Sequence, residues 1–172
     1  MERFVKEVVM LKGRQRFYKL TGGIIVLGFL AILVSGCVTV QMPQYVTSQD
    51  SYQESFYANY DRTLKATIST LEKTGWKISK EAHPIAFEQS EQSRDGQIKQ
   101  ILIFTDVRQK AMFLGSRYMT INVLVRENGQ RTDVEVRYYS TLSTALKNFS
   151  SYQNDKLANK IFNLISNELE PE

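Results

Sequence analysis

A chain of 172 residues with 42% hydrophobic and 23% charged residues has the composition of one folded domain with short extensions, which argues against a disordered or wholly membrane-embedded chain. The formal net charge of +4 comes from the first 36 residues, which carry six basic and two acidic side chains. Residues 37–172 contain 16 of the 22 basic and 16 of the 18 acidic residues, so this part of the chain is formally neutral. The clustered positive charge that nucleic-acid binding needs is therefore not expected. A single cysteine excludes an intramolecular disulfide.

The first 36 residues have the organisation of a secretory signal peptide. A basic stretch at residues 14–19 precedes an unbroken apolar run at residues 24–34, whose 11 residues are fewer than the roughly 20 that a spanning helix needs. We therefore expect a targeting segment that is removed from the mature chain. The alternative is an uncleaved transmembrane helix over residues 20–40, a span interrupted by glycine and polar residues.

The apolar run leads directly into an aliphatic residue, two small residues and the cysteine: Val34-Ser35-Gly36-Cys37. This motif resembles the lipobox of bacterial lipoproteins. The resemblance implies that a signal peptidase recognises Val34, Ser35 and Gly36, that cleavage precedes Cys37, and that the Cys37 thiol carries a diacylglyceryl group and anchors the chain to a membrane. Val38 stands where enterobacterial lipoproteins of the inner membrane have Asp. This implies the outer membrane with the domain in the periplasm, or the cell membrane in a cell with one membrane.

Residues 37–52 are expected to be the lipidated cysteine and a flexible tether, because they contain a proline, several Gln, Ser and Thr residues and no apolar periodicity. The 13 residues from Val38 to Asp50 reach roughly 45 Å when fully extended. The alternative is that residues 38–40 pair as an edge strand. The folded domain is expected over residues 53–172.

The first element of this domain is predicted to be a helix over residues 53–74. Apolar residues recur there at steps of three and four and form one stripe, which we expect to face the core: Tyr57, Tyr60, Leu64, Ile68 and Leu71. Ser51 and Glu54 fit a capping box at the helix start, and Gly75 fits the residue just after its end.

Five strands are predicted to follow the helix. Residues 76–81 and 85–89 alternate in hydrophobicity around His83-Pro84, where the proline favours a turn. Residues 98–107 form a more continuously apolar strand after a turn signal at residues 94–96.

The last two strands form a hairpin. Asn128-Gly129 is the preferred sequence of a two-residue type I′ turn. With this pair at the tip, one face of the hairpin is almost wholly apolar and has these partners: Val125 with Thr132, Val123 with Val134, Ile121 with Val136, and Met119 with Tyr138. The other face is mostly polar and is expected to be solvated.

A closing helix is predicted over residues 154–169, because apolar residues share one side and Pro171 follows: Leu157, Ile161, Leu164 and Ile165. The expected fold class is α+β, with an N-terminal helix, an antiparallel sheet of about five strands and a C-terminal helix. Both helices should cover the apolar face of the sheet, because their own apolar stripes need a partner.

The sequence offers no catalytic constellation. It has one histidine, no cysteine besides Cys37 and scattered acidic residues, so no triad, zinc site, calcium loop or phosphate loop can be assembled. His83 is expected to make an ordinary hydrogen bond in its turn. We therefore expect no enzyme activity, no metal and no cofactor.

Two segments are candidates for binding. Met112, Phe113 and Leu114 lie in the connection between the third and fourth strands, where they would form an apolar tip that contacts a partner or a membrane. Three basic residues flank them: Arg108, Lys110 and Arg117. The alternative is that the segment folds back into the core. Residues 138–152 are rich in aromatic and hydroxyl side chains and would form the rim of a pocket or of a partner groove, or else a packed loop.

From lipobox to closing helix, the layout resembles small envelope lipoproteins with helix-grip domains, among them accessory lipoproteins of the outer-membrane β-barrel assembly machine. The resemblance is specific at residues 34–37 and architectural elsewhere. The anchor, the tether and a neutral domain without catalytic groups favour a noncatalytic periplasmic module, an accessory subunit of an envelope complex, with the membrane and an envelope protein as partners and no nucleic acid. The alternative is a carrier or sensor that holds an apolar small molecule or lipid between helix and sheet.

Overall fold

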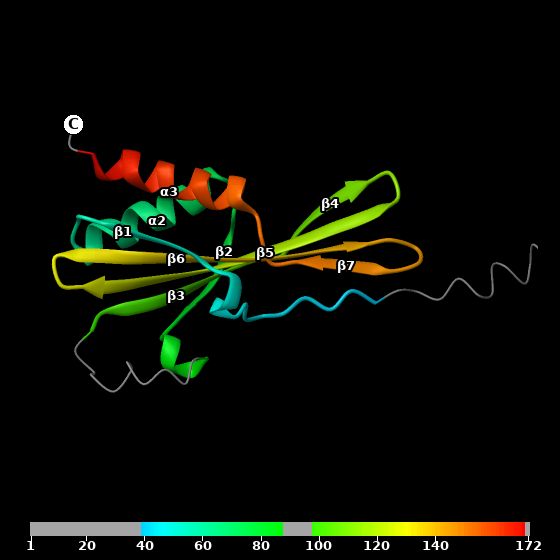
Figure 1. Ribbon diagram of the computed structural model, residues 1–172, viewed down its shortest axis with the longest axis horizontal. Helices are drawn as coiled ribbons and strands as arrows, with labels where there is room; N and C mark the ends of the chain where they lie inside the picture. The colour runs from blue at the N-terminus through cyan, green and yellow to red at the C-terminus, as the bar shows by residue number, and fades with distance from the viewer. Residues whose placement is uncertain (1–38, 88–97, 171–172) are drawn as a thin grey trace, which may run out of the picture. The chain divides into compact units, whose positions relative to one another are not determined.

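The computed structural model describes residues 39–87 and 98–170, which belong to one compact unit, Val38–Glu172, and form an antiparallel α+β domain (Figure 1). The sheet has seven strands in the order β1-β6-β5-β3-β2, with β4 on β5 and β7 on β6. The elements in chain order are the 3-10 turn Ser48–Asp50, β1 Tyr52–Phe56, α2 Tyr60–Lys73, β2 Ile78–Ala82, the 3-10 turn Pro84–Ala86, β3 Gln100–Thr105, β4 Arg108–Met112, β5 Gly115–Asn128, β6 Arg131–Ser143, β7 Asn148–Ser151 and α3 Asp155–Leu169. The predicted class is confirmed, although the sheet is larger than the expected five strands.

The helices of the described ranges are α2 and α3. Neither is long and apolar enough to cross a membrane. The closing helix lies where the sequence predicted it, and the side chain of Asn154 accepts a hydrogen bond from the Leu157 amide at its start, at 3.2 Å.

The domain begins with a strand where the sequence predicted a helix. β1 pairs antiparallel with β6, and Phe56 is buried whereas Tyr57 is 79% exposed. The helix starts only after Asn59, whose side chain accepts a hydrogen bond from the Arg62 amide at 2.8 Å. The helical prediction was wrong before this cap because pairing with the edge of β6 satisfies the backbone groups there and overrides the local periodicity.

The strands after α2 differ in part from the prediction. The strand predicted at residues 76–81 corresponds to β2, which begins two residues later and ends one residue later. The strand predicted at residues 98–107 contains β3. The one predicted at residues 85–89 is wrong in its described part, because Pro84–Ala86 is a 3-10 turn. His83 caps this turn, and its Nδ1 accepts a hydrogen bond from the Ile85 amide at 3.3 Å. Residues 88–97 lie outside the described residues, and β4 was not predicted.

The central hairpin of β5 and β6 has a register different from the predicted one. Asn128 pairs with Arg131, so the turn residues are Gly129 and Gln130 and not Asn128 and Gly129. Gly129 has a φ of 63°, and no residue other than glycine has a positive φ in the described part of the chain. This matches a type II′ turn with glycine first, whereas a type I′ turn needs two positive φ values. Each predicted pair is displaced by two residues, which leaves every side chain on its predicted face.

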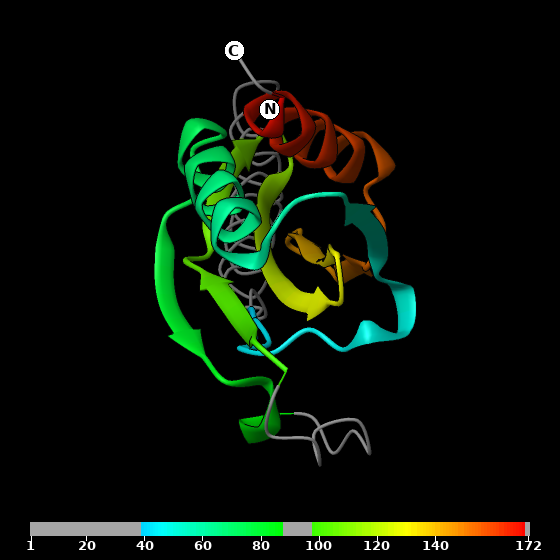
Figure 2. The ribbon, with the colours of Figure 1, turned by 90° about the vertical axis from the view of Figure 1, so that its left-hand side faces the viewer.

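One face of the sheet forms the main core together with the helices. Side chains of α2 and α3 join those of β5 and β6 in one buried cluster that includes Leu71, Ala158, Ile161, Ile165, Val123, Val125, Val134 and Val136. Figure 2 shows α2 and α3 side by side above these strands. Burial of each large aliphatic side chain contributes about 1.5–3 kcal/mol, so this cluster is the main source of stability.

The opposite face of the central hairpin is covered, although the sequence predicted that it would be solvated. Asn122 is fully buried and Arg137 is 1% exposed. Nε of Arg137 lies 2.8 Å from the Glu135 carboxylate, and its Nη1 donates to the Tyr45 hydroxyl at 2.9 Å. Oδ1 of Asn122 accepts a hydrogen bond from the Val46 amide at 2.7 Å. The N-terminal segment therefore covers this face and supplies partners for its polar groups.

The segment that the sequence predicted to be a tether thus belongs to the domain in part. Val46 is 2% exposed. The ring of Tyr45 stacks on Phe87 with centroids 5.6 Å apart, and Phe87 in turn contacts Phe104 at 5.0 Å. Figure 2 shows the segment along the side of the sheet away from α2 and α3. The packed structure accordingly starts before the predicted boundary at residue 53.

Replacement of Gly129 by valine is expected to destabilise the domain by about 1 kcal/mol or more, because a β-branched residue adopts a positive φ poorly. A Cβ at this position would meet no atom within 4 Å, so the loss would come from backbone conformation alone. The matched control is Gln130→Val, at a turn position without a positive φ. Thermal unfolding of residues 38–172 measures both changes, and an unchanged midpoint for Gly129→Val would contradict the turn.

Removal of one partner of the buried ion pair is expected to be costly. Arg137→Met should destabilise the domain by about 3–5 kcal/mol, because the Glu135 carboxylate is left buried without its partner. The double variant Glu135→Leu with Arg137→Met should recover much of this loss, since no unpaired charge remains. Urea unfolding of the two single variants and the double variant gives the coupling energy, and additive losses would mean that the two charges do not depend on each other.

Candidate functional site

The central hairpin extends beyond the helices (Figure 1). β3 and β4 pair with successive parts of one edge of β5, at residues 122–126 and 115–119, and β1 and β7 likewise share one edge of β6. One half of the hairpin therefore lies with the helices, and the other half is a four-stranded ribbon in the order β4-β5-β6-β7. We call residues 108–119 and 140–151 the distal ribbon.

The β4–β5 turn of the distal ribbon exposes the apolar residues that the sequence singled out. Met112 pairs with Gly115, which leaves Phe113 and Leu114 as the two turn residues. Phe113 is 99% exposed and Leu114 is 74% exposed. The alternative in which this segment fills the core is therefore wrong for these two residues, and their contact with a partner or a membrane stays a prediction.

A second apolar tip lies at the β6–β7 turn, within the segment predicted to be a pocket rim or a packed loop. Ser143 pairs with Asn148, and Thr144 closes the turn because its amide and its hydroxyl both donate to the Lys147 carbonyl. Leu146 at this tip is 95% exposed. Sequence reasoning missed the hairpin because the turn contains none of the Gly, Pro, Asn or Asp residues that mark turns.

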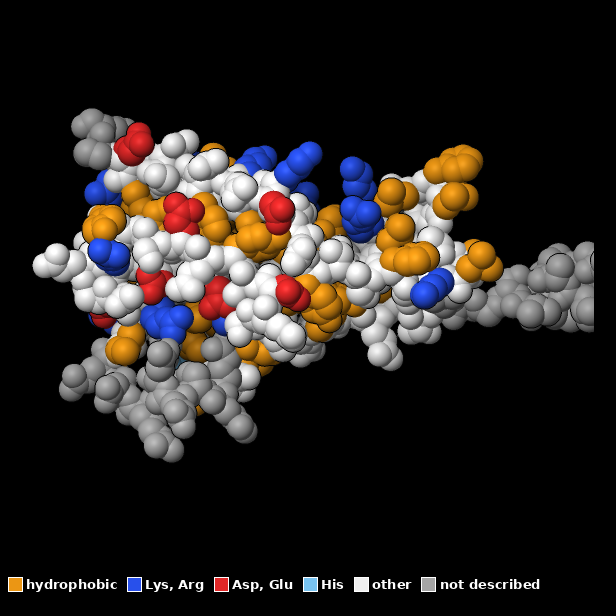
Figure 3. Space-filling view, in the orientation of Figure 1, with side chains coloured by type: hydrophobic (Ala, Val, Ile, Leu, Met, Phe, Trp, Pro, Cys, Tyr) orange, Lys and Arg blue, Asp and Glu red, His pale blue; other side chains and the backbone are white. Residues whose placement is uncertain are grey.

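The two tips lie next to each other at one end of the sheet. The β5–β6 register places Ser116 opposite Ser143, so the two turns extend from the same residue pair. Their backbones are in close contact, since a Cβ on Gly115 would overlap the Ser143 carbonyl oxygen. Figure 3 shows hydrophobic side chains gathered at this end, over β4 and β7. Phe113 and Leu146, the most exposed large hydrophobic residues that the structure describes, thus belong to one surface.

The distal ribbon is basic as well as apolar. It contains four basic residues and no acidic one: Arg108, Lys110, Arg117 and Lys147. All four side chains are exposed. Arg108 also stabilises the end of α2, because its Nη1 donates to the Thr74 carbonyl at 3.1 Å and its guanidinium lies 4.7 Å from the Trp76 ring centroid. Lys110 pairs with Arg117 close to the β4–β5 turn, and Lys147 lies in the β6–β7 turn.

The N-terminal segment contacts the domain at this same end. The side-chain amide of Asn148, the first residue of β7, donates to the Thr39 carbonyl at 3.3 Å. Thr39 is two residues after Cys37, and two residues span at most about 7 Å. The chain length between the predicted lipidation site and this contact is therefore short. The lipobox itself, residues 34–37, lies outside the described residues.

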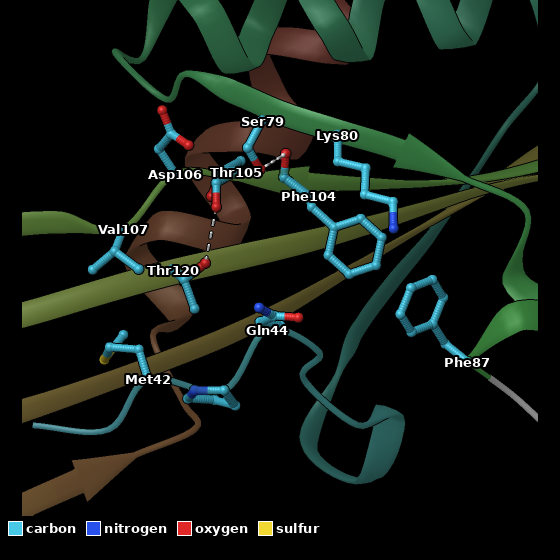
Figure 4. Close-up of a pocket in the computed structure, with 11 residues that line it drawn as sticks. Met42, Gln44, Ser79, Lys80, Phe87, Phe104, Thr105, Asp106, Val107 and Thr120 are labelled. Carbon is cyan, nitrogen blue, oxygen red and sulfur yellow. Dashed lines mark hydrogen bonds between the residues drawn. The ribbon is translucent and has the colours of Figure 1, made fainter.

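A pocket of about 470 Å³ lies on the face of the sheet that the N-terminal segment covers, opposite the helices (Figure 4). Met42 and Gln44 of the N-terminal segment line it, together with residues of β2 and β3. Nζ of Lys80 lies 5.3 Å from the ring centroid of Phe87 and 5.9 Å from that of Phe104, so an ammonium group and two rings form part of the wall. This mixed wall suits an amphipathic molecule better than a purely apolar one.

Two tyrosines of the domain have a raised pKa. Partial burial and a 2.6 Å hydrogen bond to the Asp155 carboxylate raise the pKa of the Tyr52 hydroxyl, which also accepts from the Asn154 amide at 2.7 Å. This hydroxyl joins β1 to the start of α3. Burial raises the pKa of Tyr60 in α2. Within residues 39–87 and 98–170, no group of His, Cys, Asp or Glu side chains is placed to hold a metal ion.

In comparisons with known proteins, no family model matches the chain, and no curated protein matches it. Three features of the chain itself bear on its function. These are the exposed apolar tips, their basic surroundings and the arrival of the N-terminal segment beside them.

Truncation of Phe113 to alanine is expected to change the free energy of unfolding by less than about 0.5 kcal/mol, because the side chain is fully exposed. The matched control is Phe162→Ala in the main core, where the ring contacts Phe56, and this change should cost about 3–5 kcal/mol. Urea unfolding of residues 38–172 compares the two variants. A loss at Phe113 as large as the loss at Phe162 would place the tip in the core.

Proposed function

We propose that this chain is a lipid-anchored lipoprotein of the cell envelope whose domain is a noncatalytic interaction module, an accessory subunit of an envelope complex. Lipidated Cys37 would hold it on the outer membrane with the domain in the periplasm, or on the cell membrane in a cell with one membrane. The observation that carries the proposal is the pair of exposed tips. Phe113, Leu114 and Leu146 are between 74% and 99% exposed, so most of their apolar surface is available to contact another surface.

The helix-grip resemblance adds that both helices cover one face of the sheet. The single buried cluster that α2 and α3 share with β5 and β6 supports this arrangement. Such a domain has its helices on one half of the central hairpin. The distal ribbon is then the half that is available for binding.

The alternative proposal is a carrier or sensor of an apolar small molecule or lipid. Leu71, Ile161 and Val123 are fully buried between the helices and the sheet, so core side chains occupy the space where the sequence placed the ligand. The pocket of about 470 Å³ beneath the N-terminal segment is the better candidate, and its wall of an ammonium group and two rings suits an amphipathic lipid. Native mass spectrometry of the chain from a detergent-free lysate should show a retained small molecule, and a consistently empty chain would contradict the carrier.

The lipid anchor is tested by Cys37→Ser. This variant should lose incorporation of a fatty-acid analogue, and it should leave the membrane or keep its full leader, because the acceptor thiol is gone. Val38→Asp is the matched control, which should keep the lipid and, by the enterobacterial rule, move to the inner membrane. Metabolic labelling and membrane fractionation measure both outcomes. Equal labelling of Cys37→Ser and the parent chain would contradict the lipobox.

The accessory-subunit role is tested by affinity capture of the full chain after crosslinking in cells. Capture should recover the same envelope protein in repeated experiments. Recovery should fall for Phe113→Asp, whether the tip contacts the partner itself or the membrane on which the partner lies. It should not fall for Gln130→Asp, which lies in the opposite turn of the central hairpin. A chain that is consistently recovered alone would rule out the accessory subunit.

A further inference from the structure

The distal ribbon has a charge opposite to that of the rest of the mature chain. It carries four basic residues and no acidic one, whereas the remaining residues from 37 onward include 12 of the 16 basic residues and all 16 acidic ones. Figure 3 shows Lys and Arg side chains beside the protruding hydrophobic ones, with the visible Asp and Glu over the other half of the domain. A surface of this kind is complementary to anionic groups.

The convex shape of the two tips suits insertion into a lipid layer. Phe113, Leu114 and Leu146 project from two tight turns whose backbones meet at Gly115 and Ser143. A protein partner would need a matching cavity for each convex tip, whereas acyl chains rearrange around any apolar shape. Aliphatic and aromatic side chains flanked by Lys and Arg are the residues that interfacial segments use at the boundary between head groups and acyl chains.

Chain connectivity places lipid beside this end of the domain. Asn148 holds Thr39 at the start of β7, and two residues of chain, at most about 7 Å long, separate Thr39 from Cys37. If the leader were instead retained as a spanning helix, the apolar run would end at residue 34, within roughly 18 Å of the same contact. The two interpretations of the leader thus agree on a membrane next to the tips.

We propose that the distal ribbon docks on the lipid bilayer that holds the N-terminus of the chain. Phe113, Leu114 and Leu146 would insert among the acyl chains. Three cations of the ribbon, Lys110, Arg117 and Lys147, would lie beside the phosphate groups of anionic lipids. This inference rests on the proposed anchor for the position of the bilayer, and it names the occupant of the tips. β5 spans roughly 40 Å from this tip to the Gly129 turn, so docking holds the opposite turn away from the bilayer.

Fluorescence quenching tests this docking in the full chain. The chain is reconstituted into vesicles of phosphatidylethanolamine and phosphatidylglycerol with brominated acyl chains. Trp76, the only tryptophan, is buried and is replaced by phenylalanine in every variant. Phe113→Trp should then show blue-shifted emission and several-fold stronger quenching than the matched control Gln130→Trp in the opposite turn, because only the former side chain reaches the acyl chains.

The electrostatic part is tested by charge reversal. Lys110→Glu together with Lys147→Glu should weaken the quenching of the tryptophan at position 113. The same two reversals at Lys156 and Lys160, exposed residues of α3, should not weaken it. Vesicles of phosphatidylcholine alone should reduce the quenching of the parent tryptophan variant, because they lack anionic head groups.

The outcomes separate the docking from the anchor. A chain that floats with the vesicles and is quenched equally at positions 113 and 130 overturns the docking and leaves the anchor intact. A chain that does not float but is quenched at position 113 on mixing with vesicles contradicts the anchor alone. A photocrosslinker at position 113 that reacts in cells with a protein and not with lipid overturns the docking in favour of a protein partner.

Discussion

The hydrogen-bond ladder between β5 and β6 is the constraint on which the rest of the domain depends. It extends from Asn128 opposite Arg131 to Ser116 opposite Ser143, and each outer edge of the pair carries two shorter strands in succession. The same register therefore decides where the helix-covered half ends and where the distal ribbon begins. A slip of one residue would exchange the two faces of a strand, and would place Arg137 against the helices in place of the valines.

The burial of charge on the second face makes the N-terminal segment part of the fold. The Arg137 guanidinium is buried beside Glu135 and donates to Tyr45, and the Asn122 side chain accepts from Val46. A buried cation without such partners would cost several kcal/mol. A segment whose composition indicates a linker thus supplies specific contacts over a separation of 76 residues from Val46 to Asn122. Local sequence patterns carry no information on such a separation.

The alternation of apolar and polar residues along β5 and β6 made it predictable which residues share a face of the central hairpin, because successive side chains of a strand point to opposite faces. The turn was not predictable, since Asn128-Gly129-Gln130 permits glycine as either the second or the first turn residue, and the choice depends on a small local difference in φ. The candidate site was half predictable. Met112 to Leu114 are visible as consecutive apolar residues among basic ones, whereas Leu146 belongs to a hairpin whose turn lacks the usual residues and whose strand β7 is mostly polar.

The burial of Val46 and the contact at Thr39 limit how far the domain can move from a lipid anchor at Cys37. A free tether of 13 residues would give the domain a radius of roughly 45 Å, but only two to nine residues remain between the lipid and the first held positions, which reduces the radius to roughly 7–30 Å. Because the accessible volume scales with the cube of that radius, the local concentration of the domain at the bilayer rises by about threefold to a few hundredfold. Under the proposed anchor, the domain would have little reach away from the membrane and would act on molecules that diffuse in or along it.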